Sequence, residues 1–184
     1  MTDDLPFPLR GSTLITGPSN AGKTRLTALA LRRWVEREGS AGVVVLEFAP
    51  ELERDGRVLG GRLDRFGPLP THDWIGVVEA HAPRAEGADV EAAFGLARSN
   101  AARARAVLDA APADPRAVFV NDATIPFQAG AAPTPLTDYC ERATVAVLNA
   151  FESDELGTDD PVSRYERAAR ETLEAWADRH VRLD

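Results

Sequence analysis

One residue of this sequence has a type and a position that indicate chemistry. Of 21 lysine and arginine residues, Lys23 is the sole lysine, and it lies between Gly17-Pro18-Ser19-Asn20-Ala21-Gly22 and Thr24. This spacing, G-x-x-x-x-G-K-[ST], surrounds phosphate oxygens with backbone N–H groups and brings a slim ammonium group to the β- and γ-phosphates. The broad planar guanidinium of arginine does not make the same reach. The pattern therefore predicts that the chain binds a nucleoside triphosphate.

The residues on either side of this loop have the patterns that a phosphate loop requires. Ser12 to Thr16 is a short apolar and β-branched run, which predicts a strand leading into the loop. Leu26, Leu29, Ala30 and Trp34 then recur at helical spacing, which predicts a helix that ends at Gly39 and directs its positive N-terminus at the phosphates. The predicted nucleotide-binding residues are Gly17, Pro18, Ser19, Asn20, Ala21, Gly22, Lys23, Thr24 and Arg25.

Two acidic residues follow apolar runs that we expect to be buried strands. Asp122 follows Val118-Phe119-Val120-Asn121, and Glu47 follows Val43-Val44-Val45-Leu46. Open α/β sheets bind ligands at the carboxyl ends of their strands. We therefore predict that Asp122, on a strand neighbouring that of the loop, holds Mg²⁺ together with the hydroxyl of Thr24. Glu47 is predicted to orient a substrate or to activate the attacking group. The alternative for each carboxylate is a solvated strand end.

Other polar residues are weaker candidates for the site. Four arginines lie in the charged, Gly-rich stretch 51–70, where one could close over the departing phosphate; they are Arg54, Arg57, Arg62 and Arg65. A solvated role is favoured for them, and for three arginines of the last predicted helix, Arg164, Arg167 and Arg170. Asn149, with Glu152 three residues on, is faintly similar to the base-reading N-K-x-D signature, but Ala150 and Glu152 stand where lysine and aspartate are expected. ATP is therefore the expected nucleotide and GTP is possible. The three histidines are too scattered to predict a metal cluster.

Composition excludes several other classes of protein. The sequence has 184 residues, a formal net charge of −8, 44% hydrophobic residues and a single cysteine, Cys140. The negative charge opposes nucleic-acid binding, and one cysteine cannot form an internal disulfide. The sequence has no apolar run of membrane-spanning length and begins with acidic rather than basic residues, so we expect a cytoplasmic protein with no membrane partner. Its oligomeric state is not indicated.

Further strands and helices are predicted to alternate along the chain. Strands are expected at 43–48, 74–80, 117–122, 144–149 and 181–183, and helices from Asp89, around 136–142 and from Asp160-Pro161. A helix over 139–151 is the alternative to the strand at 144–149. A hairpin is expected to turn at Asp55-Gly56, within a mobile lid insertion at 51–70. We also expect a turn at Pro83 and a loop from Pro126 to Pro135. This alternation predicts one α/β domain over residues 1–184, with a mainly parallel sheet and helices on both faces.

Taken together, Gly17 to Thr24 and Asp122 resemble the P-loop NTPase superfamily. The stretch from Gly22 to Phe66 is also similar to small archaeal nucleoside-triphosphatases, which carry a charged, Gly/Arg-bearing hairpin after their first helix. Those proteins usually follow their strand aspartate with a second acidic residue, where this chain has Ala123. The resemblance implies a P-loop fold with Mg²⁺ and ATP as cofactors, and Ala123 argues against efficient unaided activation of water.

Three functions are consistent with these residues. The first is a Mg²⁺-dependent nucleoside-triphosphatase that cleaves the β–γ bond, with Lys23 and the loop amides stabilising the developing charge. The second is a small-molecule kinase, in which Glu47 positions an acceptor hydroxyl and the 51–70 segment excludes water. The third is a nucleotide-responsive regulator that needs no fast chemistry.

Overall fold

The described part of the chain is built around one parallel sheet. The computed structural model describes residues 4–54 and 57–184, with only the backbone described for 52–54 and 57–60. Its six-stranded sheet has the spatial order β5 (Trp74–Val77), β2 (Val43–Glu47), β6 (Ala117–Asn121), β7 (Val145–Phe151), β1 (Gly11–Gly17) and β8 (Arg179–Arg182). Every neighbouring pair is parallel. The predicted α/β class is therefore confirmed.

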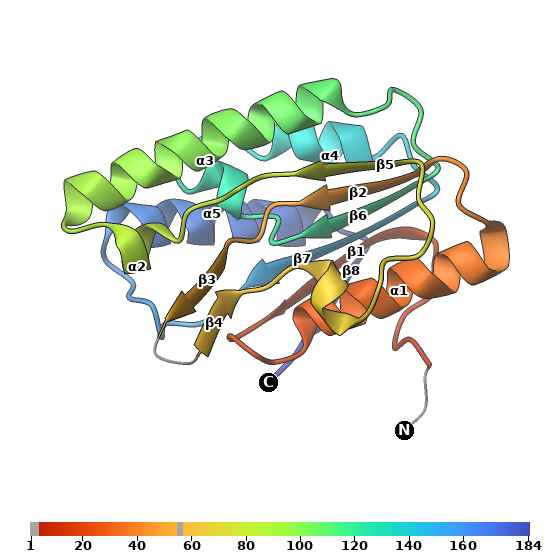
Figure 1. The fold of residues 1–184 in the computed structure, drawn as a ribbon, viewed down its shortest axis with the longest axis horizontal. Helices are drawn as coiled ribbons and strands as arrows, with labels where there is room; N and C mark the ends of the chain where they lie inside the picture. Colours follow the sequence, from red (N-terminus) through yellow and green to blue (C-terminus); the bar gives the residue numbers. More distant parts are fainter. Residues whose placement is uncertain (1–3, 55–56) are drawn as a thin grey trace.

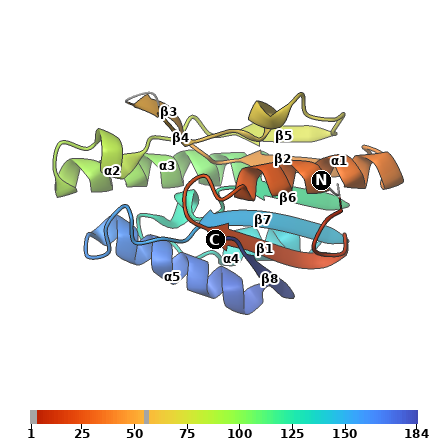
Figure 2. The same cartoon turned by 90° about the horizontal axis from the view of Figure 1, so that it is seen from below.

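Helices cover both faces of this sheet, as expected (Figures 1 and 2). One face packs α1 (Lys23–Glu38) and the 3-10 helix η1 (Leu63–Phe66), through residues such as Leu31 and Trp34, against Ile15, Val45 and Phe119. The other face packs α3 (Val90–Ala110), α4 (Thr134–Cys140) and α5 (Pro161–Trp176) against alternate residues of the same strands. Strands buried on both faces explain the continuous apolar runs seen in the sequence.

Capping side chains fix where the two long helices on this second face begin. The Asp89 carboxylate accepts a hydrogen bond from Ala92 N–H at the start of α3, and the Asp160 carboxylate does the same for Ser163 N–H at the start of α5. Each cap satisfies a backbone donor that has no partner within its helix. Both predicted starts are confirmed. Within α5, Val162, Ala169 and Leu173 are buried in the core, whereas Tyr165 is 42% exposed.

Segments between the main elements differ from the prediction in several places. Pro83 is the first residue of a short helix, α2 (Pro83–Glu86), and not part of a simple turn, because proline is favoured at a first helical position. The expected loop from Pro126 to Pro135 contains the end of a 3-10 helix, η2 (Ile125–Phe127), and the first residues of α4. No helix of the described residues has both the length and the apolar character needed to cross a membrane.

The predicted hairpin is formed by two short strands outside the main sheet. β3 (Glu51–Arg54) pairs antiparallel with β4 (Arg57–Gly60), whereas the proposed turn at Asp55-Gly56 lies outside the described residues. At the base of the hairpin Gly61 N–H donates to the Pro50 carbonyl at 3.1 Å. Beyond it, Leu63 is fully buried and η1 packs on α1. The mobility expected for 51–70 stays a prediction.

Candidate functional site

The loop between β1 and α1 has the backbone shape that its glycines predict. Asn20 and Gly22 have positive φ angles of 63° and 94°, and Gly22 is the residue that caps α1. Among the described residues no side chain caps this helix, and its first turn holds no acidic residue. Within that part of the chain the first N–H groups of α1 thus have no side-chain acceptor, which is the arrangement that binds anions at a helix N-terminus.

A cavity of about 760 Å³ opens beside this loop at the carboxyl edge of the sheet. Its volume falls within the range of about 300–1,000 Å³ that is typical of small-molecule sites. Among the predicted nucleotide-binding residues, those that line it are Ser19, Asn20, Gly22, Lys23, Thr24 and Arg25. Gly17, Pro18 and Ala21 complete the loop without lining the cavity. The metal candidates Thr24 and Asp122 border the same space.

Lys23 lies at the junction of the loop and the helix. Its Nζ donates to the Pro18 carbonyl and lies 5.8 Å from the centre of the Phe151 ring. Burial lowers the pKa of Lys23, and the carboxylates of Asp122 and Glu155 oppose that shift. The ammonium group therefore sits in a partly desolvated place where attraction to an added anion is stronger than in water.

Asp122 follows the last residue of β6 and has a left-handed backbone, with φ at 59°. Its N–H donates to Asn149 Oδ1 at 3.0 Å, and its own Oδ1 is buried with no hydrogen-bond partner among the described residues. Burial raises the pKa of Asp122 to about 7, Glu166 adds to the increase, and Lys23 and Arg84 oppose it. A buried carboxylate oxygen without a donor fits a hard cation such as Mg²⁺, with the Thr24 hydroxyl as a second ligand.

The strand of Asp122 is not the immediate neighbour of the loop strand, so this part of the sequence prediction was wrong. β7 lies between β1 and β6, and its residue Asn149 bridges the gap. The Asn149 Nδ2 group donates to Thr27 Oγ1 of α1 and to Asn121 Oδ1, both at 2.9 Å. The side-chain hydrogen bonds of Asn149 all go to the protein and the residue is 2% exposed, which gives it a structural role, and the expectation of ATP over GTP stays a prediction.

Glu47 lies at the end of β2, but its contacts are all with the protein. Its Oε2 accepts from Leu63 N–H at 2.9 Å, and its Oε1 accepts from Asn121 Nδ2 at 2.6 Å. The residue is 2% exposed and is not among the residues that line the cavity. Burial raises the pKa of Glu47 to about 7 despite these donors. The contacts give Glu47 a structural role in holding η1 to the sheet, and its predicted role in chemistry stays a prediction.

Of the two arginines in the 51–70 stretch whose side chains are described, Arg62 and Arg65, one lines the cavity. Arg65 is exposed at its border. Arg62 lies 3.9 Å from Glu51 and faces Glu47 closely enough to affect that carboxyl group's pKa. The side chains of Arg54 and Arg57 lie outside the described part of the chain.

Two site residues that the sequence analysis missed come from elements after β5. Arg84, on α2, and Glu166, on α5, both line the cavity, and Arg84 Nη1 lies 2.6 Å from Glu166 Oε2. Their side chains are 16% and 6% exposed. Pro83 as a helix-starting residue was the available signal for α2, but nothing in the sequence pairs residues 84 and 166.

A third newly found contact involves the loop after β7. Ser19 N–H donates to Glu155 Oε1 at 2.9 Å, so a carboxylate of the chain itself occupies one N–H group of the phosphate loop. Glu155 is exposed and lines the cavity with Leu156. An anionic ligand bound in the phosphate loop would compete with this carboxylate for the Ser19 N–H group.

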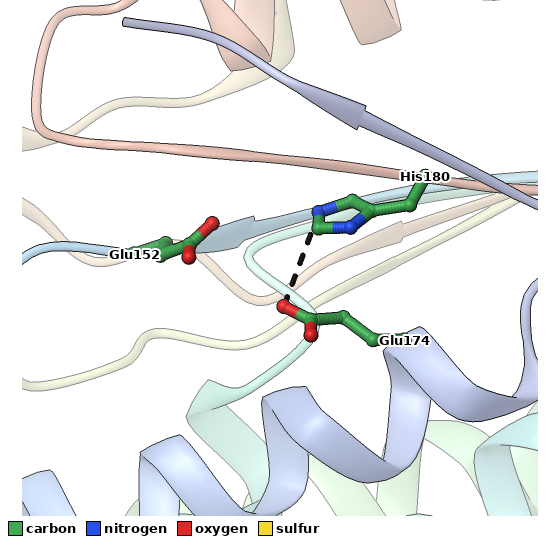
Figure 3. Close-up of side chains that lie close together, drawn as sticks. All are labelled: Glu152, Glu174 and His180. Carbon is green, nitrogen blue, oxygen red and sulfur yellow. Dashed lines mark ion pairs between the residues drawn. The ribbon is translucent and has the colours of Figure 1, made fainter.

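A cluster of two glutamates and a histidine lies at the other end of α5 and is shown in Figure 3. Ligand atoms of Glu152, Glu174 and His180 all lie within 4.8 Å of one another. Arg170 Nη1, however, lies 3.0 Å from Glu152 and 2.6 Å from Glu174, and Arg182 Nη2 lies 2.8 Å from Glu152. Guanidinium groups thus already neutralise the carboxylates, which opposes cation binding. Arg170, predicted to be solvated, is 15% exposed and bound in this cluster.

The sequence was compared with protein-family models and with curated proteins, and neither comparison identifies a relative. No protein-family model matches the sequence, and a comparison with curated proteins finds no match. The parallel α/β fold is compatible with the P-loop NTPase superfamily that Gly17 to Thr24 resembles.

Proposed function

We propose that this protein binds a Mg²⁺-nucleoside triphosphate, with ATP as the expected nucleotide, and cleaves its β–γ bond. One observation supports the proposal most strongly: Lys23 and the uncapped N-terminus of α1 border the same cavity as Asp122, whose Oδ1 lacks a partner among the described residues. A cation, an array of N–H donors and a carboxylate are the groups that a metal-bound triphosphate requires.

Each residue has a defined task in this proposal. Backbone N–H groups of residues 19–24 bind the phosphate oxygens, and Lys23 stabilises the charge that grows on them as the bond breaks. Thr24 and Asp122 hold Mg²⁺, which supplies neutralisation of the phosphates when it is bound. Asn149 keeps the backbone of Asp122 in place relative to α1 through Thr27. Ala123 offers no second carboxylate, so slow hydrolysis is expected.

Calorimetry and phosphate release test this function directly. We expect saturable heat when Mg²⁺-ATP is titrated into the protein, and loss of that heat in Lys23→Ala. Lys23 is the first residue of α1, and alanine is the best helix former, so the variant should fold. Arg37→Ala, at an exposed residue in the last turn of the same helix that does not line the cavity, serves as the control for a general loss of charge. An unchanged titration in Lys23→Ala would refute the proposal.

A small-molecule kinase is the second candidate, and the extent of the cavity favours it. The lining continues past Asp122 to Pro83 on α2, Ile125 and Gln128 near η2, and Glu166 on α5. A space beyond the phosphate loop that is walled by three elements can hold a phosphate acceptor away from water. Mass spectrometry of small-molecule pools incubated with the protein and Mg²⁺-ATP would detect a phosphorylated product. Phosphate release without any such product would favour the hydrolase.

A further inference from the structure

Arg84 is a second cation placed at the same aromatic ring as Lys23. Its guanidinium carbon lies 5.8 Å from the centre of the Phe151 ring, the same distance as Lys23 Nζ. Both side chains line the cavity, and the positive charge of each opposes the rise that burial causes in the pKa of Asp122. Lys23 and Arg84 thus approach the metal-binding carboxylate from different elements, one from the phosphate loop and one from α2.

Glu166 holds this guanidinium in place. Its Oε2 accepts from Arg84, and its Oε1 accepts from Thr124 Oγ1 at 3.2 Å and from Gln128 Nε2 at 3.0 Å. Arg84 Nη1 also donates to Ser163 Oγ at 3.0 Å. Nη1 is the guanidinium nitrogen in both bonds, so the planar fork retains donors for another anion. An arginine held by one carboxylate beside an open cavity is prepared to bind a second anionic group.

The position of α2 explains how such a contact would be made. The helix α2 and the preceding Ala82 lie in the connection that follows β5, at the carboxyl edge of the sheet. Ala82, Pro83, Arg84 and Ala85 all line the cavity, so this connection forms the wall that faces the phosphate loop. Arg84 therefore lies on the wall that the outer end of a loop-bound triphosphate approaches.

We propose that Arg84 binds the terminal phosphate of the nucleotide and distinguishes a triphosphate from a diphosphate. The inference rests on the proposed function, because it assigns one residue to the γ-phosphate of the same ligand. The loop amides hold the inner phosphates and Lys23 reaches the β- and γ-phosphates, whereas Arg84 adds a contact to the γ-phosphate alone. The role that the sequence offered to the arginines of 51–70 is thereby assigned to an arginine outside that segment.

Binding of two nucleotides separates this role from a structural one. Affinities for Mg²⁺-ADP and for a non-hydrolysable Mg²⁺-ATP analogue are measured by calorimetry for the wild type, Arg84→Gln and Arg84→Lys. Arg84→Gln should weaken binding of the triphosphate analogue about tenfold and leave ADP binding within about twofold, because charge-assisted hydrogen bonds have this magnitude. Arg84→Lys, which retains the charge but not the fork, should give an intermediate loss.

Arg170→Gln is the matched control. Arg170 lies on α5, is 15% exposed against 16% for Arg84, and is also paired with glutamates, but it does not line the cavity. Its variant should bind both nucleotides like the wild type. Equal weakening for both nucleotides in Arg84→Gln and Arg84→Lys, or no weakening, would overturn the inference while leaving nucleotide binding intact. A wild type that binds neither nucleotide would instead overturn the proposed function. If Arg84→Gln does not fold, the same comparison is made with Arg84→Lys alone.

Discussion

Two carboxyl groups, at the ends of β6 and β2, have the same raised pKa but differ in the hydrogen-bond partners of their oxygens. Asp122 and Glu47 both have a pKa of about 7, and burial is the main cause in each case. Glu47 accepts hydrogen bonds on both oxygens, whereas Asp122 has a buried oxygen without a partner among the described residues and lines the cavity. A perturbed pKa thus marks burial in both places, and only the unpaired oxygen points to a ligand.

Asp122→Asn should give the largest effect and separates the two carboxyl groups most clearly. Removal of the charge that binds Mg²⁺ should lower metal-dependent turnover by about two to three orders of magnitude. The melting temperature should not fall, because the amide avoids the cost of burying a carboxylate. Phosphate release and thermal denaturation are measured on the same preparation. Full turnover in the variant would remove Asp122 from the site.

Glu47→Ala should instead reduce stability. The substitution leaves Leu63 N–H and Asn121 Nδ2 without their acceptor and creates a cavity, so the free energy of unfolding should fall by about 3 kcal/mol. Urea denaturation measures it. Glu51→Ala, an exposed glutamate at the start of the hairpin, provides the control. A stable but inactive Glu47→Ala protein would contradict the structural role and restore Glu47 as a chemical residue.

Stability should also depend on pH through Glu47 in a defined direction. Because its pKa rises from 4.5 to about 7 on folding, the folded chain retains a proton that the unfolded chain has lost between these values. The retained proton adds about 3 kcal/mol to the free energy of unfolding. This stabilisation is fully present below pH 4.5 and is lost as pH rises through 7. Between about pH 5 and pH 7.5, the free energy of unfolding should therefore fall less steeply with rising pH in Glu47→Gln than in the wild type, as measured by urea denaturation. Identical slopes would show that Glu47 ionises normally.

Glu155→Gln tests a smaller effect at the phosphate loop. Glu155 accepts the Ser19 N–H that a phosphate oxygen would use, so neutralising it should tighten Mg²⁺-ATP binding about threefold. The neighbouring Asp154 is also exposed but does not line the cavity, so Asp154→Asn is the control for general charge. Equal effects in the two variants would mean that the Ser19 contact is unimportant and only the net charge acts.

The local patterns of the sequence predicted the elements well because each pattern has a local cause. Gly17 to Thr24 fixed the loop between β1 and α1, and Asp89 and Asp160 fixed two helix starts through caps that span three residues. The β7 strand was likewise expected from its apolar run. Such signals need only a few adjacent residues, and the structure confirms them.

The features that the sequence did not predict depend on pairs of residues far apart in the chain. No pattern places β7 between β1 and β6, because a buried apolar strand can pair with any other. Arg84 and Glu166 meet across 82 positions, and Asn149 contacts Thr27 across 122. An asparagine side chain suits both base reading and structural bridging, and the bridging role of Asn149 is visible only in its internal hydrogen bonds to Asp122, Thr27 and Asn121.

The hydrogen bond from Gly61 N–H to the Pro50 carbonyl makes the β3–β4 hairpin a separable module. Its two ends leave and re-enter the body of the protein at one point, while Glu47 and Asn121 anchor the chain just beyond that point at Leu63 and Gly61. A hairpin of another length or composition can therefore be grafted between residues 50 and 61 without redesign of the sheet edge below. Variation among homologous chains should be concentrated there.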